Sequence, residues 1–146
     1  MTFETLESKR KERKKSTAED FTPLPLVNEI LDRLTIYFND SVWDKEKIFI
    51  DPACGNGNFL IEVLKRKLAK KHDPLKAIST IYGADIMQDN IKECRIRLLK
   101  VLTEYVKQHK LPKPNSIKVI QILYSNIKWV DTNKYPNGSL DYNFEF

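Results

Sequence analysis

The chain has 146 residues, of which 31% are charged and 41% hydrophobic, and it carries a formal net charge of +5. This length predicts a single domain with a buried core. No apolar run approaches the roughly 20 residues needed to span a bilayer, and no secretory segment is present, so we expect no membrane partner. Cys54 and Cys94 have no CxxC spacing or histidines around them, which argues against a disulfide framework or a metal site and favours the reducing cytoplasm.

Two basic segments supply much of the positive charge. Lys9–Lys15 belongs to residues 1–18, which we expect to form a basic arm or loose helix ahead of an ordered domain at 19–146. The second segment, Lys65–Lys71, falls within a helix predicted at 58–71, and we expect its lysines on the side opposite the apolar stripe. Such runs can neutralise nucleic-acid phosphates, which makes DNA a candidate partner, although an isolated run is more often a solvated face.

The spacing of apolar residues predicts the secondary structure. The predicted helices, which carry apolar residues at helical spacing or a capping signal, cover 25–37, 58–71, 74–79 and 88–108. The predicted strands, which are short apolar runs, cover 47–50, 81–85 and 127–130. Residues 39–46 are predicted as a polar loop, and 117–124 fit a strand or a helix.

Alternation of strands and helices predicts an α/β fold with a short parallel sheet flanked by helices. Ligands of such sheets bind at the carboxyl ends of the strands. Asp51, Asp85 and Asp131 each follow a predicted strand and should therefore share this edge. Three acids at one edge are difficult to attribute to core packing.

The segment Asp51–Leu60, which reads DPACGNGNFL, is the most informative part of the chain. It follows an apolar strand and precedes an amphipathic helix, and Gly55 and Gly57 allow backbone N–H groups to approach a ligand closely. The segment is neither a GxxxxGK[ST] phosphate loop nor a complete dinucleotide fingerprint, because it lacks the third glycine.

This segment instead resembles motif I of the N6-adenine DNA methyltransferases, which holds the methionine part of S-adenosylmethionine. Three further segments resemble motifs of that family: Phe21–Pro23 its FTP motif, Gly83–Ile86 its motif II, and Asn126–Ile127 with Asp131 its motif III. In that family the motif II acid accepts both ribose hydroxyls, the apolar residue after it packs on the adenine, and the motif III acid takes the adenine amino group.

The resemblance implies a truncated Rossmann-like methyltransferase domain with S-adenosylmethionine as cofactor, and a role in DNA methylation such as restriction-modification. The implied cofactor-binding residues are Phe21, Thr22, Pro23, Asp51, Pro52, Ala53, Cys54, Gly55, Asn56, Gly57, Asp85, Ile86 and Asp131. Simpler interpretations remain open for several of them. Thr22 or Asp85 would also serve as a helix cap, Asp131 as a turn acid, and Cys54 as a small packed residue rather than a nucleophile.

The family's [DNS]-P-P-[YF] motif, which orients the acceptor amine, is absent from the sequence. Asn143 and Phe146 have the spacing of its outer residues, but both prolines are missing, and we interpret this as coincidence. We also expect no target-recognition domain within these 146 residues. We therefore expect cofactor binding without independent methyl transfer. The alternatives are a non-enzymatic cofactor-binding or interaction protein, and one subunit of a split methyltransferase whose partner supplies catalysis and DNA recognition. The incomplete sheet edge is a candidate site for a protein partner or a second copy of the chain.

Overall fold

A computed structural model of the chain describes residues 7–9 and 21–131, and a parallel sheet of three strands lies at its centre. The strands, β1 (Phe49–Asp51), β2 (Ile81–Asp85) and β3 (Ile127–Trp129), are arranged in the order β1-β2-β3. β2 pairs in parallel with both neighbours, with Ile50 opposite Tyr82 and Ala84 opposite Lys128. The predicted α/β class, with a short parallel sheet flanked by helices, is confirmed.

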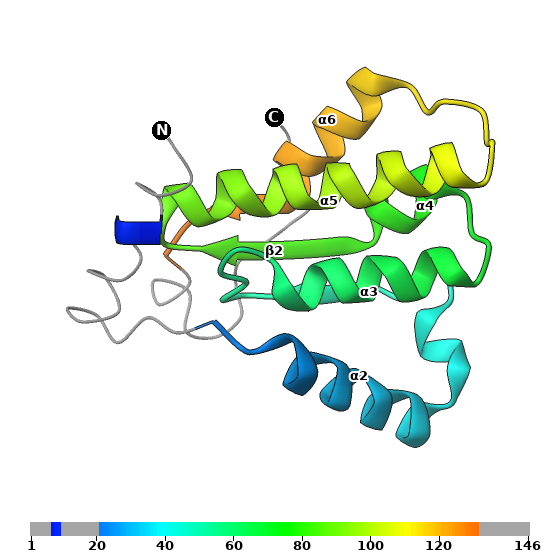
Figure 1. The fold of residues 1–146 in the computed structure, drawn as a ribbon, viewed down its shortest axis with the longest axis horizontal. Helices are drawn as coiled ribbons and strands as arrows, with labels where there is room; N and C mark the ends of the chain where they lie inside the picture. Colours follow the sequence, from blue (N-terminus) through cyan, green and yellow to red (C-terminus); the bar gives the residue numbers. More distant parts are fainter. Residues whose placement is uncertain (1–6, 10–20, 132–146) are drawn as a thin grey trace.

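Helices connect and flank these strands (Figure 1). They are α2 (Leu24–Phe38), the 3-10 helix η1 (Asp40–Trp43), α3 (Asn58–Ala69), α4 (Pro74–Ser79), α5 (Gln88–Gln108) and α6 (Ser116–Asn126). The Asp73 carboxylate caps α4 by accepting a hydrogen bond from the Lys76 N–H at 3.0 Å, as its place before Pro74 predicted. Among the described residues, no helix has the length and apolar character needed to cross a membrane.

The segment whose sequence fitted a strand or a helix forms α6. Its start is determined by Asn115, whose side-chain oxygen accepts hydrogen bonds from the N–H groups of Ile117 and Lys118 at 3.0 and 3.2 Å. Val119 and Leu123 follow one helical turn apart, and both are buried. The capping asparagine thus selects the helix, whereas the apolar pattern alone does not distinguish the two structures.

The segment predicted as a polar loop, residues 39–46, contains the 3-10 helix η1. The buried side chain of Trp43 attaches this helix to the rest of the protein. Trp43 is only 3% exposed, and its indole N–H donates a hydrogen bond to the Thr35 hydroxyl at 2.9 Å. The Arg66 guanidinium lies 5.4 Å from the centre of the Trp43 ring. The prediction of a simple loop was incomplete, because one buried aromatic side chain determines the packing of an otherwise polar segment.

Helices α3 and α5 lie across the same face of the sheet (Figure 1). Fully buried aliphatic side chains such as Leu64 and Leu98 fill the space beneath them. Strand residues alternate between faces, so Ile50 lies on the opposite side, where it remains 50% exposed, and Ile48 is 63% exposed. Parallel sheets are normally covered on both faces, so this second face is the least complete part of the described fold.

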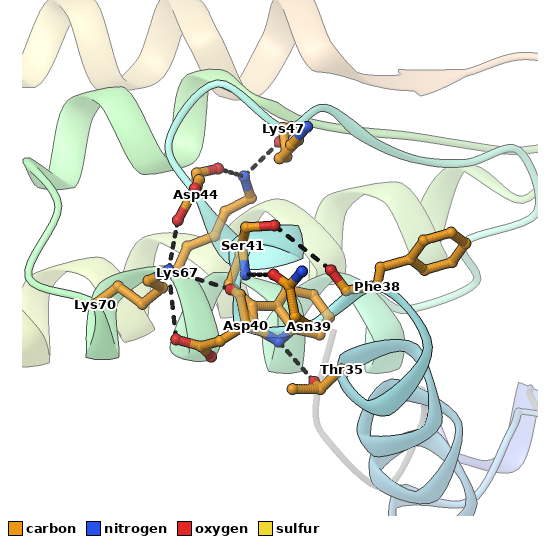
Figure 2. A network of polar contacts seen from close by, with 10 residues as sticks. Thr35, Phe38, Asn39, Asp40, Ser41, Asp44, Lys47, Lys67 and Lys70 are labelled. Carbon is orange, nitrogen blue, oxygen red and sulfur yellow. Dashed lines mark hydrogen bonds and ion pairs between the residues drawn. The ribbon is translucent and has the colours of Figure 1, made fainter.

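The lysines predicted for the solvent side of the helix at 58–71 include one that is buried. Lys67 is 1% exposed, and its ammonium group donates hydrogen bonds to the backbone carbonyls of Asp44 and Lys47 (Figure 2). Burial lowers the pKa of Lys67 to about 8, although Asp44 and Glu46 oppose this shift. The expectation of an outward lysine was wrong here, because the loop carbonyls above α3 provide acceptors for its ammonium group.

Neighbouring cations of the Lys65–Lys71 segment are also bound within the chain. Lys70 forms ion pairs with the carboxylates of Asp44 and Asp40, the latter at 3.4 Å (Figure 2), and Arg66 pairs with Asp32 at 2.7 Å. These side chains hold α2, η1 and α3 together. The segment therefore offers fewer free charges to a nucleic acid than its sequence suggests. Most of the other basic segment, Lys9–Lys15, lies outside the described residues.

Candidate functional site

A pocket of about 340 Å³ opens at the carboxyl ends of β1 and β2. Segments from three parts of the chain line it: the residues before α2, the glycine loop after β1 and the turn after β2. The lining residues that the sequence predicted are Phe21, Thr22, Ala53, Cys54, Gly55, Asn56, Asp85 and Ile86. Asn58, Phe59 and Met87, which were not predicted, complete the wall.

The glycine loop depends on two residues in the left-handed backbone region. Gly55 has φ +54° and Gly57 has φ +96°. A Cβ atom at Gly55 would lie 2.9 Å from the Phe21 ring, and one at Gly57 would lie 2.7 Å from the Cys94 sulfur. Glycine is therefore required at position 57 both by backbone conformation and by the close approach of α5. Phe21 likewise packs directly over the loop.

Asp85, at the end of β2, accepts hydrogen bonds from both sides of the pocket. Its Oδ1 receives the Gly55 N–H at 3.3 Å, and its Oδ2 receives the Met87 N–H at 3.0 Å and the Asn90 side-chain amide at 3.1 Å. The residue at the N-cap of α5 is Met87, whose side chain makes no capping bond. Asp85 thus does more than cap a helix, because it connects the glycine loop to the start of α5.

Asp51 lies close behind the same loop and accepts the Ala53 N–H at 3.1 Å. Burial raises the pKa of its carboxyl group, the Ala53 hydrogen bond opposes this, and the nearby negative charge of Asp85 raises it further. Two acids at the carboxyl edge of the sheet therefore repel each other. Such an arrangement costs stability and favours a ligand that brings positive charge or hydrogen-bond donors.

Cys54 faces Cys94 of α5, and both side chains are buried and free of a disulfide. The contact with the Cys94 thiol, together with burial, raises the pKa of Cys54 far above its usual range. A thiol in this state is protonated and unreactive at neutral pH, which supports a packing role rather than a nucleophilic one.

Two residues that were not predicted from the sequence, Asn58 and Arg97, hold the residues before α2 against the glycine loop by hydrogen bonds. Asn58 donates a hydrogen bond from its side-chain amide to the Thr22 carbonyl at 2.9 Å. Arg97 of α5 donates to the Asn58 side-chain oxygen at 2.8 Å and to the Asn56 carbonyl at 3.0 Å. Thr22 does not cap α2, whose N-cap is Pro23 without a side-chain bond. Arg97 stands between the apolar residues Ile96 and Leu98 of its helix, and this interruption was the one sign in the sequence that its side chain has a specific partner.

One polar atom of the glycine loop has no partner among the described residues. The side-chain oxygen of Asn56 is buried and accepts no hydrogen bond from residues 7–9 or 21–131. Unsatisfied buried acceptors are rare in folded proteins and usually mark a missing water or ligand. Because Asn56 also lines the pocket, this oxygen is available to a donor that enters there.

Other predicted residues lie near the pocket without lining it. Pro23, Asp51, Pro52 and Gly57 adjoin the lining residues in sequence, and Asp131 follows β3 at the same sheet edge, as the last described residue. Asn126, part of the third motif, donates a hydrogen bond to the Ser79 carbonyl at 3.1 Å, which ties α6 to the end of α4.

Fold and site together define an α/β protein of the Rossmann-like type, with a ligand pocket at the carboxyl edge of its parallel sheet. Comparison with family models gives a match to the N-6 DNA methylase family over residues 3–141. Since the match spans nearly the whole sequence, the chain belongs to the N-6 DNA methylase family. Comparisons with curated proteins and with solved structures gave no match.

Proposed function

We propose that the pocket at the carboxyl ends of β1 and β2 binds S-adenosylmethionine, the methyl donor generally used by this family. The main support is the convergence of Phe21–Thr22, the glycine loop and Asp85–Ile86 on one pocket. Its volume falls within the range of small-molecule sites, roughly 300–1,000 Å³.

The residues present fit the chemistry of this cofactor. The unpaired oxygen of Asn56 suits the donors of an amino acid ammonium group. An ionised carboxylate offers about four acceptor positions, so Asp85 can receive ribose hydroxyls in addition to, or in exchange for, its present donors. Ile86, which is 54% exposed, offers an apolar surface for a purine ring. Asp131 remains a candidate for the adenine amino group.

When bound, the cofactor supplies an electrophilic methyl group. The sequence contains no [DNS]-P-P-[YF] segment to orient an acceptor amine toward it. We therefore propose that these 146 residues bind the cofactor without transferring its methyl group by themselves. Transfer of tritiated methyl groups to unmethylated DNA by the purified chain would contradict this part of the proposal.

Calorimetric titration of the purified chain tests the binding directly. We expect saturable heat with S-adenosylmethionine and with its demethylated product at ligand concentrations up to roughly a millimolar. Fluorescence gives a second measurement, because the indole N–H of Trp129 donates to the Ile86 carbonyl at 2.7 Å, beside the pocket. Absence of both signals with both ligands would refute the proposal.

The open face of the sheet supports a second candidate, in which another chain completes the domain. Ile48 and Ile50 expose apolar surface there, and β1 is paired on one side only among the described residues. Such a face and edge attract further polypeptide, either a second copy or a subunit that supplies the acceptor motif.

The mass of the purified chain measured by light scattering tests this candidate, with Ile50→Glu as the variant. Association that Ile50→Glu abolishes supports completion at this face. If the chain is a monomer and Ile50→Glu does not change its solubility, the open face gives no support for completion by another chain.

DNA binding, which the basic segments suggest, should fall steeply with salt and show little sequence preference.

A further inference from the structure

A second hollow, of about 410 Å³, lies between the C-terminal half of α5 and the N-terminal half of α6. It shares no lining residue with the pocket above. Leu102 and Val119 form a buried floor, 2% and 4% exposed, while Leu99, Leu111 and Ile120 form walls that remain 38% to 50% exposed. We name this hollow, with its apolar walls, the α5–α6 groove.

A stripe of exposed apolar side chains continues the α5–α6 groove along α6. Ile117, Ile120 and Tyr124 follow at spacings of three and four residues, so they share one face of the helix, and they are 69%, 50% and 58% exposed. The Arg95 guanidinium lies 4.0 Å from the centre of the Tyr124 ring and donates a hydrogen bond to the Ile127 carbonyl. This contact holds the aromatic end of the stripe in place.

Three lysines surround the α5–α6 groove. Lys107, Lys110 and Lys113 belong to its lining, and none forms an ion pair with a described residue. Residues 100–118 contain five lysines and a single acid, Glu104. The groove is therefore apolar inside and positively charged around its mouth.

Lys110 is held in a backbone conformation that favours glycine. Its φ is +50°, and α5 ends in a motif in which the Lys110 N–H bonds the Lys107 carbonyl at 3.3 Å and the Leu111 N–H bonds the Val106 carbonyl at 3.0 Å. Glycine is the usual residue at this position of such a helix end. A lysine here keeps a positive charge at the rim at some cost in stability.

We propose that the α5–α6 groove binds an amphipathic, acidic helix of a partner protein. An apolar helix face fits the groove and the stripe along α6, and acidic side chains flanking that face complement the three lysines. A nucleic acid fits less well, because its phosphates gain nothing from an apolar floor. Bases would need exposed aromatic faces on which to stack, and Arg95 already covers one face of Tyr124.

Fluorescence polarisation with designed peptides tests this assignment. The probes are labelled helical peptides of roughly 16 residues that carry leucines along one face and glutamates beside it, with the leucine positions varied across a small panel. Control peptides have the same composition in shuffled order, or lysine in place of glutamate. We expect at least one acidic amphipathic peptide to bind about ten-fold more tightly than both controls.

Two variants locate the binding in the groove. Ile120→Glu should weaken it about ten-fold or more, because a half-exposed wall residue becomes acidic while the fold is retained. Lys110→Gly should raise the melting temperature yet weaken binding by roughly two- to five-fold, a combination that a purely structural role does not produce. Lys45→Ala, an exposed lysine outside the groove, is the matched control and should change neither quantity.

Three results would overturn the proposal. The first is equal binding of the acidic amphipathic and shuffled peptides, or no binding by any peptide of the panel. The second is binding that Ile120→Glu and Lys110→Gly leave unchanged. The third is tighter association with duplex DNA or with anionic phospholipid vesicles, if that association is lost in the groove variants.

Discussion

The two lysines Lys67 and Lys70 at the C-terminal end of α3 differ from the polar groups at its N-terminal end in whether they have partners. At its C-terminal end, the ammonium of Lys67 bonds two loop carbonyls, and Lys70 is paired with two carboxylates (Figure 2). At its N-terminal end, the Asn56 side-chain oxygen has no partner in the described part of the chain, and the charges of Asp51 and Asp85 repel each other.

The presence or absence of partners distinguishes a structural network, at the C-terminal end of α3, from a candidate binding site, at its N-terminal end. A buried polar network that satisfies its own members is explained by folding alone. Groups that the fold brings together without satisfying them cost free energy, and such costs are concentrated at functional sites. The C-terminal network of α3 therefore needs no ligand, whereas the N-terminal end offers an acceptor and negative charge to one.

Gly57→Ala should have the largest effect, because the N-terminal end of α3 depends on a backbone that only glycine adopts easily. The added Cβ would meet the Cys94 sulfur at 2.7 Å, and φ is +96°. We expect a loss of roughly 2–4 kcal/mol in the free energy of unfolding, from backbone strain and overpacking together. Urea denaturation measures this loss.

Combining Gly57→Ala with Cys94→Ala provides the control, because it removes the clash and leaves only the backbone strain. Part of the lost stability should return in the double variant. If Gly57→Ala alone costs nothing measurable, the close packing of the loop against α5 is not a constraint.

Lys67 should give the C-terminal network a distinct pH dependence. Its pKa is about 8 in the folded chain and 10.5 when unperturbed. Between these values the unfolded chain holds a proton that the folded chain lacks, so unfolding takes up a proton and stability rises with pH. Across this window the free energy of unfolding should gain roughly 2–3 kcal/mol relative to Lys67→Met. Denaturation midpoints at several pH values provide the measurement.

Lys65→Met is the matched control, since Lys65 lies on the same helix with an exposed side chain. Its stability should follow that of the unmodified chain throughout the alkaline range. Parallel pH curves for the Lys67→Met variant and the unmodified chain would show that Lys67 remains protonated in the fold.

The sequence predicts those parts of the fold and site whose signals are local. Asp73 caps its helix because it stands next to Pro74, and the glycine loop follows its strand directly. Lys67 and Trp43 were misjudged because the partners that bury them are distant in sequence: the Asp44 and Lys47 carbonyls for Lys67, and Arg66 for Trp43. These groups meet only because η1 packs against α3. Arg97 was missed for the same reason, since it contacts the glycine loop 41 residues away.

Asp85→Ala should weaken S-adenosylmethionine binding by roughly 10- to 100-fold, because charge-assisted hydrogen bonds are worth about 1.5–3 kcal/mol. Asp85→Asn separates binding from loop structure, since it keeps an acceptor for the Gly55 N–H while removing the charge. Calorimetry measures the affinity, and Glu104→Ala, which changes an exposed acid of α5 outside the pocket, should leave it unchanged. Unchanged affinity in both Asp85 variants would show that Asp85 stabilises the loop and does not bind the cofactor.

Asp51→Asn should have the smallest effect and should move stability and binding in opposite directions. Burial and Asp85 raise the pKa of Asp51, so the folded chain loses stability as the pH rises through that pKa. An asparagine keeps an acceptor for the Ala53 N–H and removes the charge, and at pH 7 it should stabilise the fold by less than about 1 kcal/mol. This advantage should disappear as the pH falls well below 3.8, the unperturbed pKa, because Asp51 is then protonated in both the folded and the unfolded chain. Affinity for the cationic cofactor should fall roughly two- to five-fold at pH 7. If the variant instead loses stability and binds as before, the charge of Asp51 serves the fold rather than the pocket.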